Sequence, residues 1–97
     1  MKDSTLRVRS KTHYASRLIL DRWRYRYNRG KYATADAASA ALDACYKEAN
    51  EMLDEALSEA ETRAARKMVK DAKAMLDETQ FAASMRLGCD FSAGRIH

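Results

Sequence analysis

Residues 34–61 read TADAASAALDACYKEANEMLDEALSEAE and contain neither glycine nor proline. Alanine, the best helix former, recurs throughout, and Thr34 followed by Asp36 is typical of a capped helix start. These residues therefore predict an amphipathic helix over about 35–57. Its small and apolar residues return at steps of three and four, which places them on one face: Leu42, Cys45, Tyr46, Ala49, Leu53, Ala56 and Ala60.

The C-terminal end of this helix is the main ambiguity in the sequence. Ser58 and Glu61 have the spacing of a capping box and the sign of the charge changes here, which favours a turn at 58–62. We favour that turn, although Glu59 and Arg63 would form a favourable pair across an unbroken helix. A second helix then covers about 62–78, with its buried side formed by Ala64, Ala65, Met68, Ala72 and Met75. The alternative is one long helix over 35–78 that pairs with a second copy in a coiled-coil dimer.

Two further helices are expected on either side of this pair. Residues 12–29 have an apolar period close to 3.6 and precede Gly30, which is typical of a helix end. The sequence Asp-Glu-Thr at 77–79 is typical of a new cap and predicts a short helix over about 80–87, with Phe81 and Met85 inward. The predicted fold class is all-α, a small bundle of three main helices with a short C-terminal one.

The length of 97 residues allows one small domain over 1–97. We expect a basic N-terminal arm at 1–11 before the bundle and an irregular tail at 88–97 after it. The core is thin, because 18 of the apolar residues are Ala, whereas Leu, Ile, Val and Phe together number 14. A chain with so few large apolar residues gains stability from a second copy or a partner, so a homodimer is expected.

Charge is distributed in three blocks along the chain. Residues 1–33 hold ten Lys or Arg against two Asp and carry a net charge of +8, whereas residues 34–61 hold eight acidic residues against Lys47. Residues 62–75 return to a net charge of +4. Helices of opposite charge attract one another, although an exposed ion pair contributes only about 0 to 1 kcal/mol. The first block exceeds what the acidic block can neutralise, which indicates an anionic partner.

The helix predicted over 12–29 has two different faces. Ile19, Leu20, Trp23 and Tyr27 lie within a sector of about 100 degrees and form the expected core side. The strict alternation of Arg and aromatic residues at 22–27 would also suit a strand, but the longer period favours a helix. The other side has no expected intramolecular role and provides the candidate binding residues: Tyr14, Arg17, Leu18, Arg22, Tyr25, Arg26, Arg29 and Lys31.

This mixture of side chains indicates binding and not catalysis. Guanidinium groups pair with phosphates and tyrosine rings stack on bases, so the first hypothesis is a module that engages nucleic acid or a nucleic-acid-handling complex. The second is a small inhibitor or adaptor, of the phage or mobile-element accessory type, that places the same face on an acidic protein surface. The third is a structural coiled-coil dimer.

No enzymatic, metal or cofactor site is expected. His13 and His97 are the two imidazoles, and Cys45 and Cys89 lack the paired spacing of zinc motifs. Glycine-rich phosphate loops are absent, so neither a cofactor nor a small-molecule substrate is expected. No run approaches the roughly 20 apolar residues of a membrane span, and no signal-like apolar segment follows the N-terminus. We therefore expect a cytoplasmic protein with no membrane partner.

Overall fold

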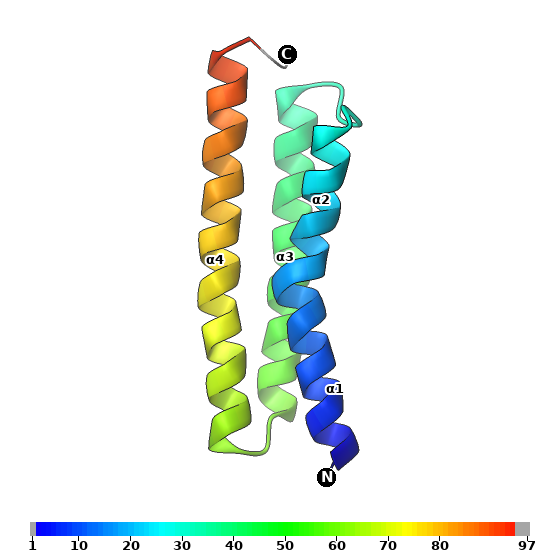
Figure 1. Cartoon of the computed structure of the whole chain (residues 1–97), viewed down its shortest axis with the longest axis vertical. Coiled ribbons are helices and arrows are strands. Elements are labelled where there is room, and N and C mark those ends of the chain that lie inside the picture. The colour runs from blue at the N-terminus through cyan, green and yellow to red at the C-terminus, as the bar shows by residue number, and fades with distance from the viewer. Residues whose placement is uncertain (1, 95–97) are drawn as a thin grey trace.

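The computed structural model describes the backbone of residues 2–94 and the side chains of residues 5–94. Its elements in chain order are α1 (Lys2–His13), the π-helical turn η1 (Tyr14–Leu18), α2 (Ile19–Asn28), α3 (Ala35–Glu59) and α4 (Arg63–Ser92). The first three follow one another without a break, and we name them together the N-terminal helix, residues 2–28 (Figure 1). The described part of the chain has no strand, so the predicted all-α fold class is confirmed.

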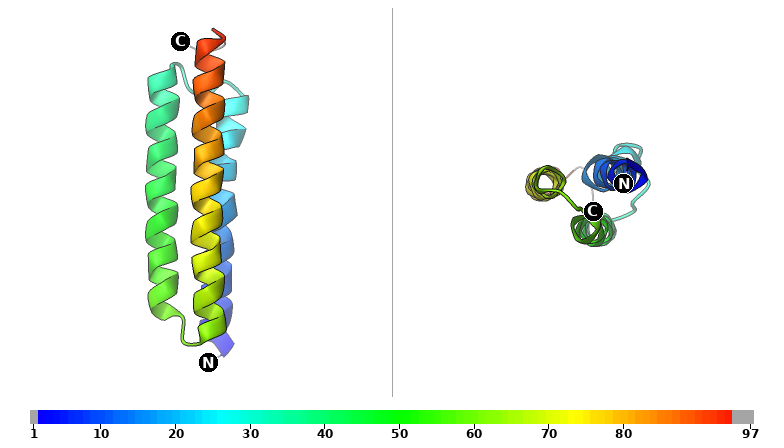
Figure 2. Two further views of the ribbon diagram at one scale, coloured as in Figure 1. Left: turned by 90° about the vertical axis from the view of Figure 1, so that its left-hand side faces the viewer. Right: turned by 90° about the horizontal axis from the view of Figure 1, so that it is seen from below.

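The three long helices lie side by side, and α4 runs parallel to the N-terminal helix while α3 runs antiparallel to both (Figure 1, Figure 2). The bundle measures 51 × 19 × 15 Å, with a radius of gyration of 15.3 Å. A compact domain of this length has a radius of about 13 Å. The bundle is more extended because α3 and α4 are 25 and 30 residues long.

The favoured turn near 58–62 is confirmed. α3 ends at Glu59 and α4 begins at Arg63, with α4 packed back along α3. The alternative of one unbroken helix over 35–78 is therefore wrong, because the chain reverses direction where the acidic block gives way to the basic one.

Both loops between long helices end on a threonine cap. Thr34 Oγ1 accepts a hydrogen bond of 3.0 Å from the backbone N–H of Ala37, and Thr62 Oγ1 accepts one of 3.0 Å from that of Ala65. Each bond satisfies one of the free N–H groups at a helix start. Ser58 does not cap α4, because its hydroxyl donates to the carbonyl oxygen three residues before it, at 2.8 Å. The start of α3 was therefore predicted from the correct residue, and that of α4 was not.

The second half of α4 differs from the prediction. The helix continues to Ser92, so the cap at 77–79 and the separate helix over 80–87 are wrong. Thr79 donates its hydroxyl to the Met75 carbonyl oxygen at 2.9 Å, as threonines inside helices do. The expected irregular tail at 88–97 is helical as far as Ser92, and Gly94 follows with a φ of 76°. Residues 95–97 of that tail lie outside the described residues.

The unbroken helix turns Phe81 and Met85 outward, where they are 64% and 55% exposed, so the expectation that they face the core is wrong. The buried face of α4 is formed by Val69, Leu76 and Leu87. Their steps of seven and eleven residues keep all three on one side of a continuous helix. Packing of this face against α3 therefore outweighs the local cap signal.

The basic segment expected as an arm at 1–11 is not separate from the bundle, because residues 2–11 belong to helix α1, and residue 1 lies outside the described residues. α1 begins at Lys2, and Val8 is only 1% exposed. Lys11 Nζ donates to Glu59 Oε2 at 2.7 Å and to Glu55 Oε1 at 3.3 Å. The acidic end of α3 therefore holds this segment on the bundle. The N-terminal helix begins at residue 2, ten residues before the predicted start at 12.

The π-helical turn η1 keeps the buried residues of the N-terminal helix in phase. One row of these residues advances in five steps that cover 19 positions, with Ala15 and Ile19 buried beside it: Val8, Thr12, Ser16, Leu20, Trp23 and Tyr27. Five turns of α-helix take only about 18 residues. The wider π turn absorbs the extra residue, so that Val8 and Tyr27 face the same side.

Trp23 is the largest side chain of the core. It is 2% exposed, donates its Nε1–H to the Ala38 carbonyl oxygen at 2.9 Å, and stacks on the Tyr27 ring with 5.0 Å between centroids. Ile19 and Leu20 are buried beside it. The predicted core side of the N-terminal helix is therefore confirmed, and the strand interpretation of 22–27 is wrong.

Candidate functional site

The eight candidate residues of the N-terminal helix do not form one surface. Tyr14 is half-buried and packs against the core, and Arg22 Nη2 lies 3.7 Å from Glu48 Oε2 on α3. Burial lowers the pKa of the Arg22 guanidinium, but Tyr14, Glu48 and Cys45 outweigh this and raise the pKa above its ordinary value. Contrary to expectation, Tyr14 and Arg22 therefore have an intramolecular role, on the contact between the N-terminal helix and α3.

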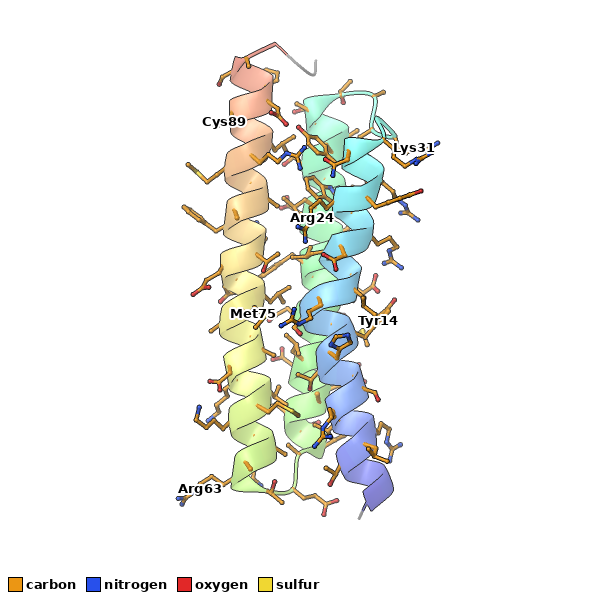
Figure 3. All side chains as sticks on the ribbon, in the orientation of Figure 1. Tyr14, Arg24, Lys31, Arg63, Met75 and Cys89 are labelled. Carbon is orange, nitrogen blue, oxygen red and sulfur yellow. The ribbon has the colours of Figure 1, made fainter. Side chains whose placement is uncertain are left out.

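The other six candidates are exposed, and four of them gather where the N-terminal helix ends. Tyr25 is 61% exposed, and the Arg29 guanidinium lies over its ring at 5.2 Å in a cation–π contact. The backbone N–H of Lys31 donates to the Arg26 carbonyl oxygen at 3.0 Å, which folds the chain back on the helix end. We name Tyr25, Arg26, Arg29 and Lys31 the Tyr25 cluster. Lys31 and Arg63 mark opposite ends of the bundle (Figure 3).

Arg17 and Leu18 lie earlier on the N-terminal helix than the Tyr25 cluster and diverge from each other. Leu18 is 45% exposed and precedes Tyr25 by seven residues, which is about two helical turns. Arg17 lines a small hollow together with Met75 and Thr79 of α4. The predicted surface is therefore divided between the Tyr25 side and the side that faces α4.

The cations of the Tyr25 cluster stand apart from the acidic residues of the fold. Among the residues that the structure describes, Arg26, Arg29 and Lys31 form no ion pair, whereas Arg24 beside them pairs with Asp21. Elsewhere on the N-terminal helix, Arg7, Lys11 and Arg22 are each neutralised by a glutamate of α3. Part of the positive charge that the fold leaves uncompensated is therefore concentrated in the cluster.

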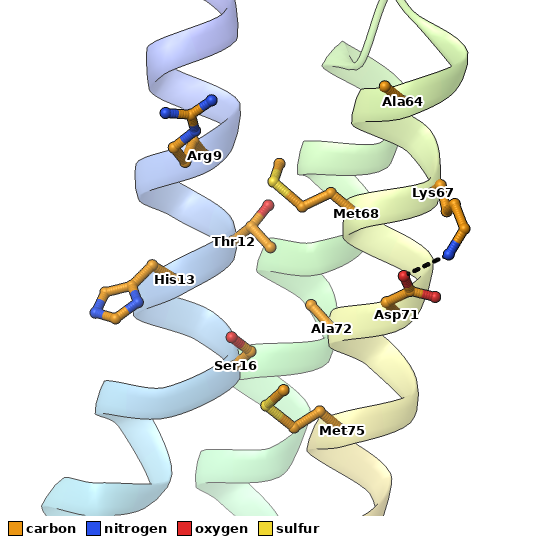
Figure 4. Close-up of a pocket in the computed structure, with 10 residues that line it drawn as sticks. All are labelled: Arg9, Thr12, His13, Ser16, Ala64, Lys67, Met68, Asp71, Ala72 and Met75. Carbon is orange, nitrogen blue, oxygen red and sulfur yellow. Dashed lines mark hydrogen bonds and ion pairs between the residues drawn. The ribbon is translucent and has the colours of Figure 1, made fainter.

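A groove that the sequence analysis did not identify lies between the N-terminal helix and α4 (Figure 4). It has a volume of 560 Å³, and its walls include Thr12, Ser16, Met68, Ala72 and Met75. The available signal was a set of small residues, because short side chains cannot fill the space between two helices: Thr12 and Ser16, one turn apart on the N-terminal helix, and Ala64 and Ala72, two turns apart on α4. Of the residues predicted for the buried side of this helix, Ala72 is buried and Ala65 and Met68 are half-buried, whereas Ala64 and Met75 are exposed.

The thiols and potential metal ligands form no site in the described residues. Cys45 is half-buried, Cys89 is exposed, and both are free. No group of three His, Cys, Asp or Glu side chains gathers within the part of the chain that the structure describes. His97, the second imidazole considered above, lies outside it. No helix in residues 2–94 combines the length and apolarity needed to cross a bilayer.

Comparison with known proteins adds no relative, since the chain matches no protein-family model, no curated protein and no solved structure. The arrangement of the side chains therefore provides the evidence for function. Two features carry it: the Tyr25 cluster at one end of the bundle, and the groove between the N-terminal helix and α4.

Proposed function

We propose that this chain is a non-enzymatic binding module that engages nucleic acid, or a complex that handles it, through the Tyr25 cluster. One observation carries the proposal: an exposed tyrosine ring stands among three cations that have no acidic partner in the described residues. Cationic side chains bind phosphates, and an exposed aromatic ring stacks on a base. A cytoplasmic location belongs to the same proposal.

The contact between Arg29 and Tyr25 prepares both side chains for binding. The Arg29 guanidinium is held over the ring at 5.2 Å, so the Arg29 side chain loses less conformational entropy when a ligand binds. A guanidinium can stack on a ring through its face and still offer the N–H groups at its edge to a phosphate. Leu18, 45% exposed, extends the apolar part of the surface along the same helix.

The cluster binds anions more readily than its neighbour Arg22. A phosphate at Arg22 competes with Glu48, which lies 3.7 Å away on α3. A phosphate at Arg26 or Arg29 displaces only water and counterions, and the release of counterions from the nucleic acid favours binding. We therefore assign the phosphate contacts to Arg26, Arg29 and Lys31, with Arg22 as a minor contributor.

Fluorescence anisotropy with labelled single-stranded and duplex oligonucleotides tests this assignment. The Arg26→Ala/Arg29→Ala variant should lose most of the affinity while keeping its helical circular dichroism. Arg63→Ala/Arg66→Ala is the matched control, because it removes the same charge from two exposed residues at the opposite end of the bundle. Equal losses in the two variants would show only a general attraction between opposite charges, and the Tyr25 cluster would not be the site.

A separate observation favours self-association as a second proposal, in which two copies meet through the outer face of α4. Phe81, Met85 and Phe91 are 64%, 55% and 56% exposed. The charged residues of this part of the helix, Arg86 and Asp90, pair with each other at 3.6 Å. Two copies can therefore join these faces without repulsion between like charges. Light scattering should show a dimer that Phe81→Ser/Phe91→Ser converts to a monomer, and a wild-type monomer at high concentration would refute the proposal.

A further inference from the structure

The groove between the N-terminal helix and α4 is walled by side chains that cannot close it. Figure 4 shows Thr12 and Ser16 on one side, and Met68, Ala72 and Met75 on the other. The alanine and serine side chains are too short to reach across, and methionine side chains adapt to whatever lies against them. The result is a groove of 560 Å³ with an adaptable apolar wall.

Two smaller hollows continue the groove along the same two helices. One of 110 Å³ shares Ser16 and Met75 with the main groove, and one of 200 Å³ shares Arg24 and Thr79 with the second. From Arg9 in the main groove to Arg24 in the last hollow, the N-terminal helix rises by about 22 Å. The groove is therefore long enough to hold an elongated ligand. A compact small molecule would fill only part of it.

Thr12 places an unsatisfied polar group in the wall of this groove. The residue is 4% exposed, and its Oγ1 has no hydrogen-bond partner in the described part of the chain. Its side chain points from the N-terminal helix toward Met68 of α4 (Figure 4). Protein atoms cover Oγ1, so a ligand in the groove does not contact it directly. A buried hydroxyl without a partner destabilises the fold, and it indicates that the side chains between the N-terminal helix and α4 are imperfectly packed here.

The rim of the groove carries an excess of positive charge. Its two acidic residues are each paired with a cation of the same helix: Asp71 with Lys67 at 2.9 Å, and Asp21 with Arg24. Arg9 and Arg17 also line the groove, and neither forms an ion pair with any described residue. A ligand that follows the groove would therefore find two uncompensated cations along the N-terminal helix.

We propose that this groove binds an amphipathic helix of a partner protein, apolar on one face and acidic along its edge. A helix of about 15 residues spans the 22 Å of the groove and turns the three-helix bundle into a four-helix bundle. Its apolar side chains pack between Met68 and Met75, and its carboxylates face Arg9 and Arg17. This inference goes beyond the nucleic-acid proposal, because it concerns a different face of the N-terminal helix.

A second copy of the chain offers no helix of this kind. The acidic helix α3 has its apolar face buried in its own core, with Leu42 and Leu53 at 1% and 0% exposed. The exposed apolar residues Phe81 and Met85 lie on α4, whose first turns are rich in Lys and Arg and would be repelled by the rim. The charge of the groove therefore selects a different, acidic partner.

Titration of the full-length chain with designed peptides tests the proposal. The probe is a peptide of about 15 residues with Leu at helical spacing and Glu on its remaining positions, compared with a Lys-for-Glu version and a scrambled Glu version. With methyl-labelled methionine, the Glu peptide should shift the NMR signals of Met68 and Met75 to saturation and leave Met85 unchanged. The Lys and scrambled peptides should bind at least about tenfold more weakly.

Two charge-reversal variants make the test specific to the groove. Arg9→Glu/Arg17→Glu should lower the affinity for the Glu peptide by about tenfold or more. Arg26→Glu/Arg29→Glu changes the net charge equally at the Tyr25 cluster and should leave peptide binding nearly intact while abolishing oligonucleotide binding. The failure of one proposal is thus distinguishable from the failure of the other.

Several results would overturn the groove proposal. These are an absence of binding by the Glu peptide, equal binding by the Lys peptide, or shifts at Met85 in place of Met68 and Met75. Shifts at Met68 and Met75 that follow protein concentration without peptide would assign the groove to a second copy, and this too would overturn it.

Discussion

Tyr27 and Asp90 stand 63 residues apart in the sequence, and the Tyr27 hydroxyl donates a hydrogen bond of 2.6 Å to Asp90 Oδ2. Both residues are buried, at 9% and 8% exposed. The Arg86 guanidinium lies 5.1 Å from the Tyr27 ring and its Nε lies 3.6 Å from the same carboxylate oxygen. These contacts join the last turns of α4 to the end of the N-terminal helix that carries the Tyr25 cluster.

The Tyr27→Phe variant removes the hydroxyl that donates this hydrogen bond and keeps the ring. We expect the free energy of unfolding to fall by about 1 to 3 kcal/mol, because Asp90 is left buried with one donor fewer. Tyr46→Phe is the control, since Tyr46 donates to Asp77 at an exposed position, and it should lower the free energy by about 0.5 to 1 kcal/mol. Urea unfolding measures both values, and equal losses would contradict a special role for the buried contact.

Trp23 and Tyr25 should respond to truncation in opposite ways. Trp23→Ala removes a side chain that is 2% exposed, and it should lower the free energy of unfolding by about 3 to 5 kcal/mol, enough to unfold a small domain. Tyr25→Ala, at a residue 61% exposed, should leave the melting temperature nearly unchanged and weaken oligonucleotide binding. A large fall in the melting temperature of the Tyr25→Ala variant would show that this ring supports the fold.

The π turn predicts how the protein responds to the deletion of one residue. Deletion of the exposed Arg17 removes the one residue that η1 absorbs, so the N-terminal helix can continue as a regular α-helix with Val8 and Tyr27 still in phase. We expect this deletion to be tolerated. Deletion of the exposed Ala44 in the regular helix α3 rotates everything after it by about 100 degrees and should unfold the protein. Thermal melts of the two deletions decide, and similar losses would refute the role assigned to η1.

The ion pair of Lys11 and Glu59 makes stability depend on pH. The hydrogen bond from Lys11 lowers the pKa of the Glu59 carboxyl below its ordinary value of 4.5, and the same bond raises the pKa of Lys11. The contribution of Glu59 is therefore complete above pH 4.5 and is lost as the pH falls through the folded pKa, because the unfolded state then binds more protons. The contribution of Lys11 is complete below pH 10.5 and is lost as the pH rises through its folded pKa.

Glu59→Gln isolates this effect. The variant should melt at a lower temperature than the wild type at neutral pH, and the difference should shrink as the pH falls below 4.5. Melting temperatures recorded across the acidic range provide the measurement. A difference that stays constant with pH would mean that the carboxylate charge of Glu59 is not what stabilises the contact.

Oligonucleotide binding should weaken steeply as salt is added. Three phosphate contacts from Arg26, Arg29 and Lys31, with Arg22 as a minor fourth, give a slope of about −3 to −4 in a plot of log affinity against log salt for duplex DNA. Arg26→Ala/Arg29→Ala should make this slope shallower by about two. Arg22 is left unchanged in this variant, since its pairing with Glu48 would confound the result. A flat salt response would favour the alternative ligand, an acidic protein surface.

The part of the fold that follows from local chemistry could be predicted from the sequence. α3 begins at the cap of Thr34, and the N-terminal helix ends before Gly30, whose φ of 71° suits a residue without a side chain. The core side with Trp23 follows from helical spacing. In these cases the hydroxyl cap, the glycine and the apolar period all indicated the same structure.

The second half of α4 could not be predicted, because local and long-range signals disagree there. The residues at 77–79 are good cap formers, yet Leu76 and Leu87 continue one apolar face across them and pack in the bundle. The buried partner of Tyr27, Asp90, was missed for the same reason, since residue 90 was assigned to an irregular tail. Only the three-dimensional packing decides between a cap and a continued helix.

The candidate site was predicted in part, and the π turn explains part of the error. A helical wheel with a constant step of about 100 degrees per residue places Tyr14 and Tyr25 on the same face of the helix. The structure inserts η1 between them, so Tyr14 turns toward α3 while Tyr25 stays outside. No residue at 14–18 is of a type that predicts a π turn. It follows from the number of residues between two buried positions, which becomes visible only when both are known to be buried.

The separation of charge between the N-terminal helix and α3 gives the bundle a dipole across its width. Residues 2–31 hold ten basic residues, and residues 35–59 hold seven acidic ones. The bundle is 19 Å across, whereas the Debye length at physiological salt is about 8 Å. A polyanion that touches the N-terminal helix is therefore largely screened from the far side of α3. We therefore expect a polyanion to meet the basic side of the bundle first, because electrostatic steering favours that orientation before contact.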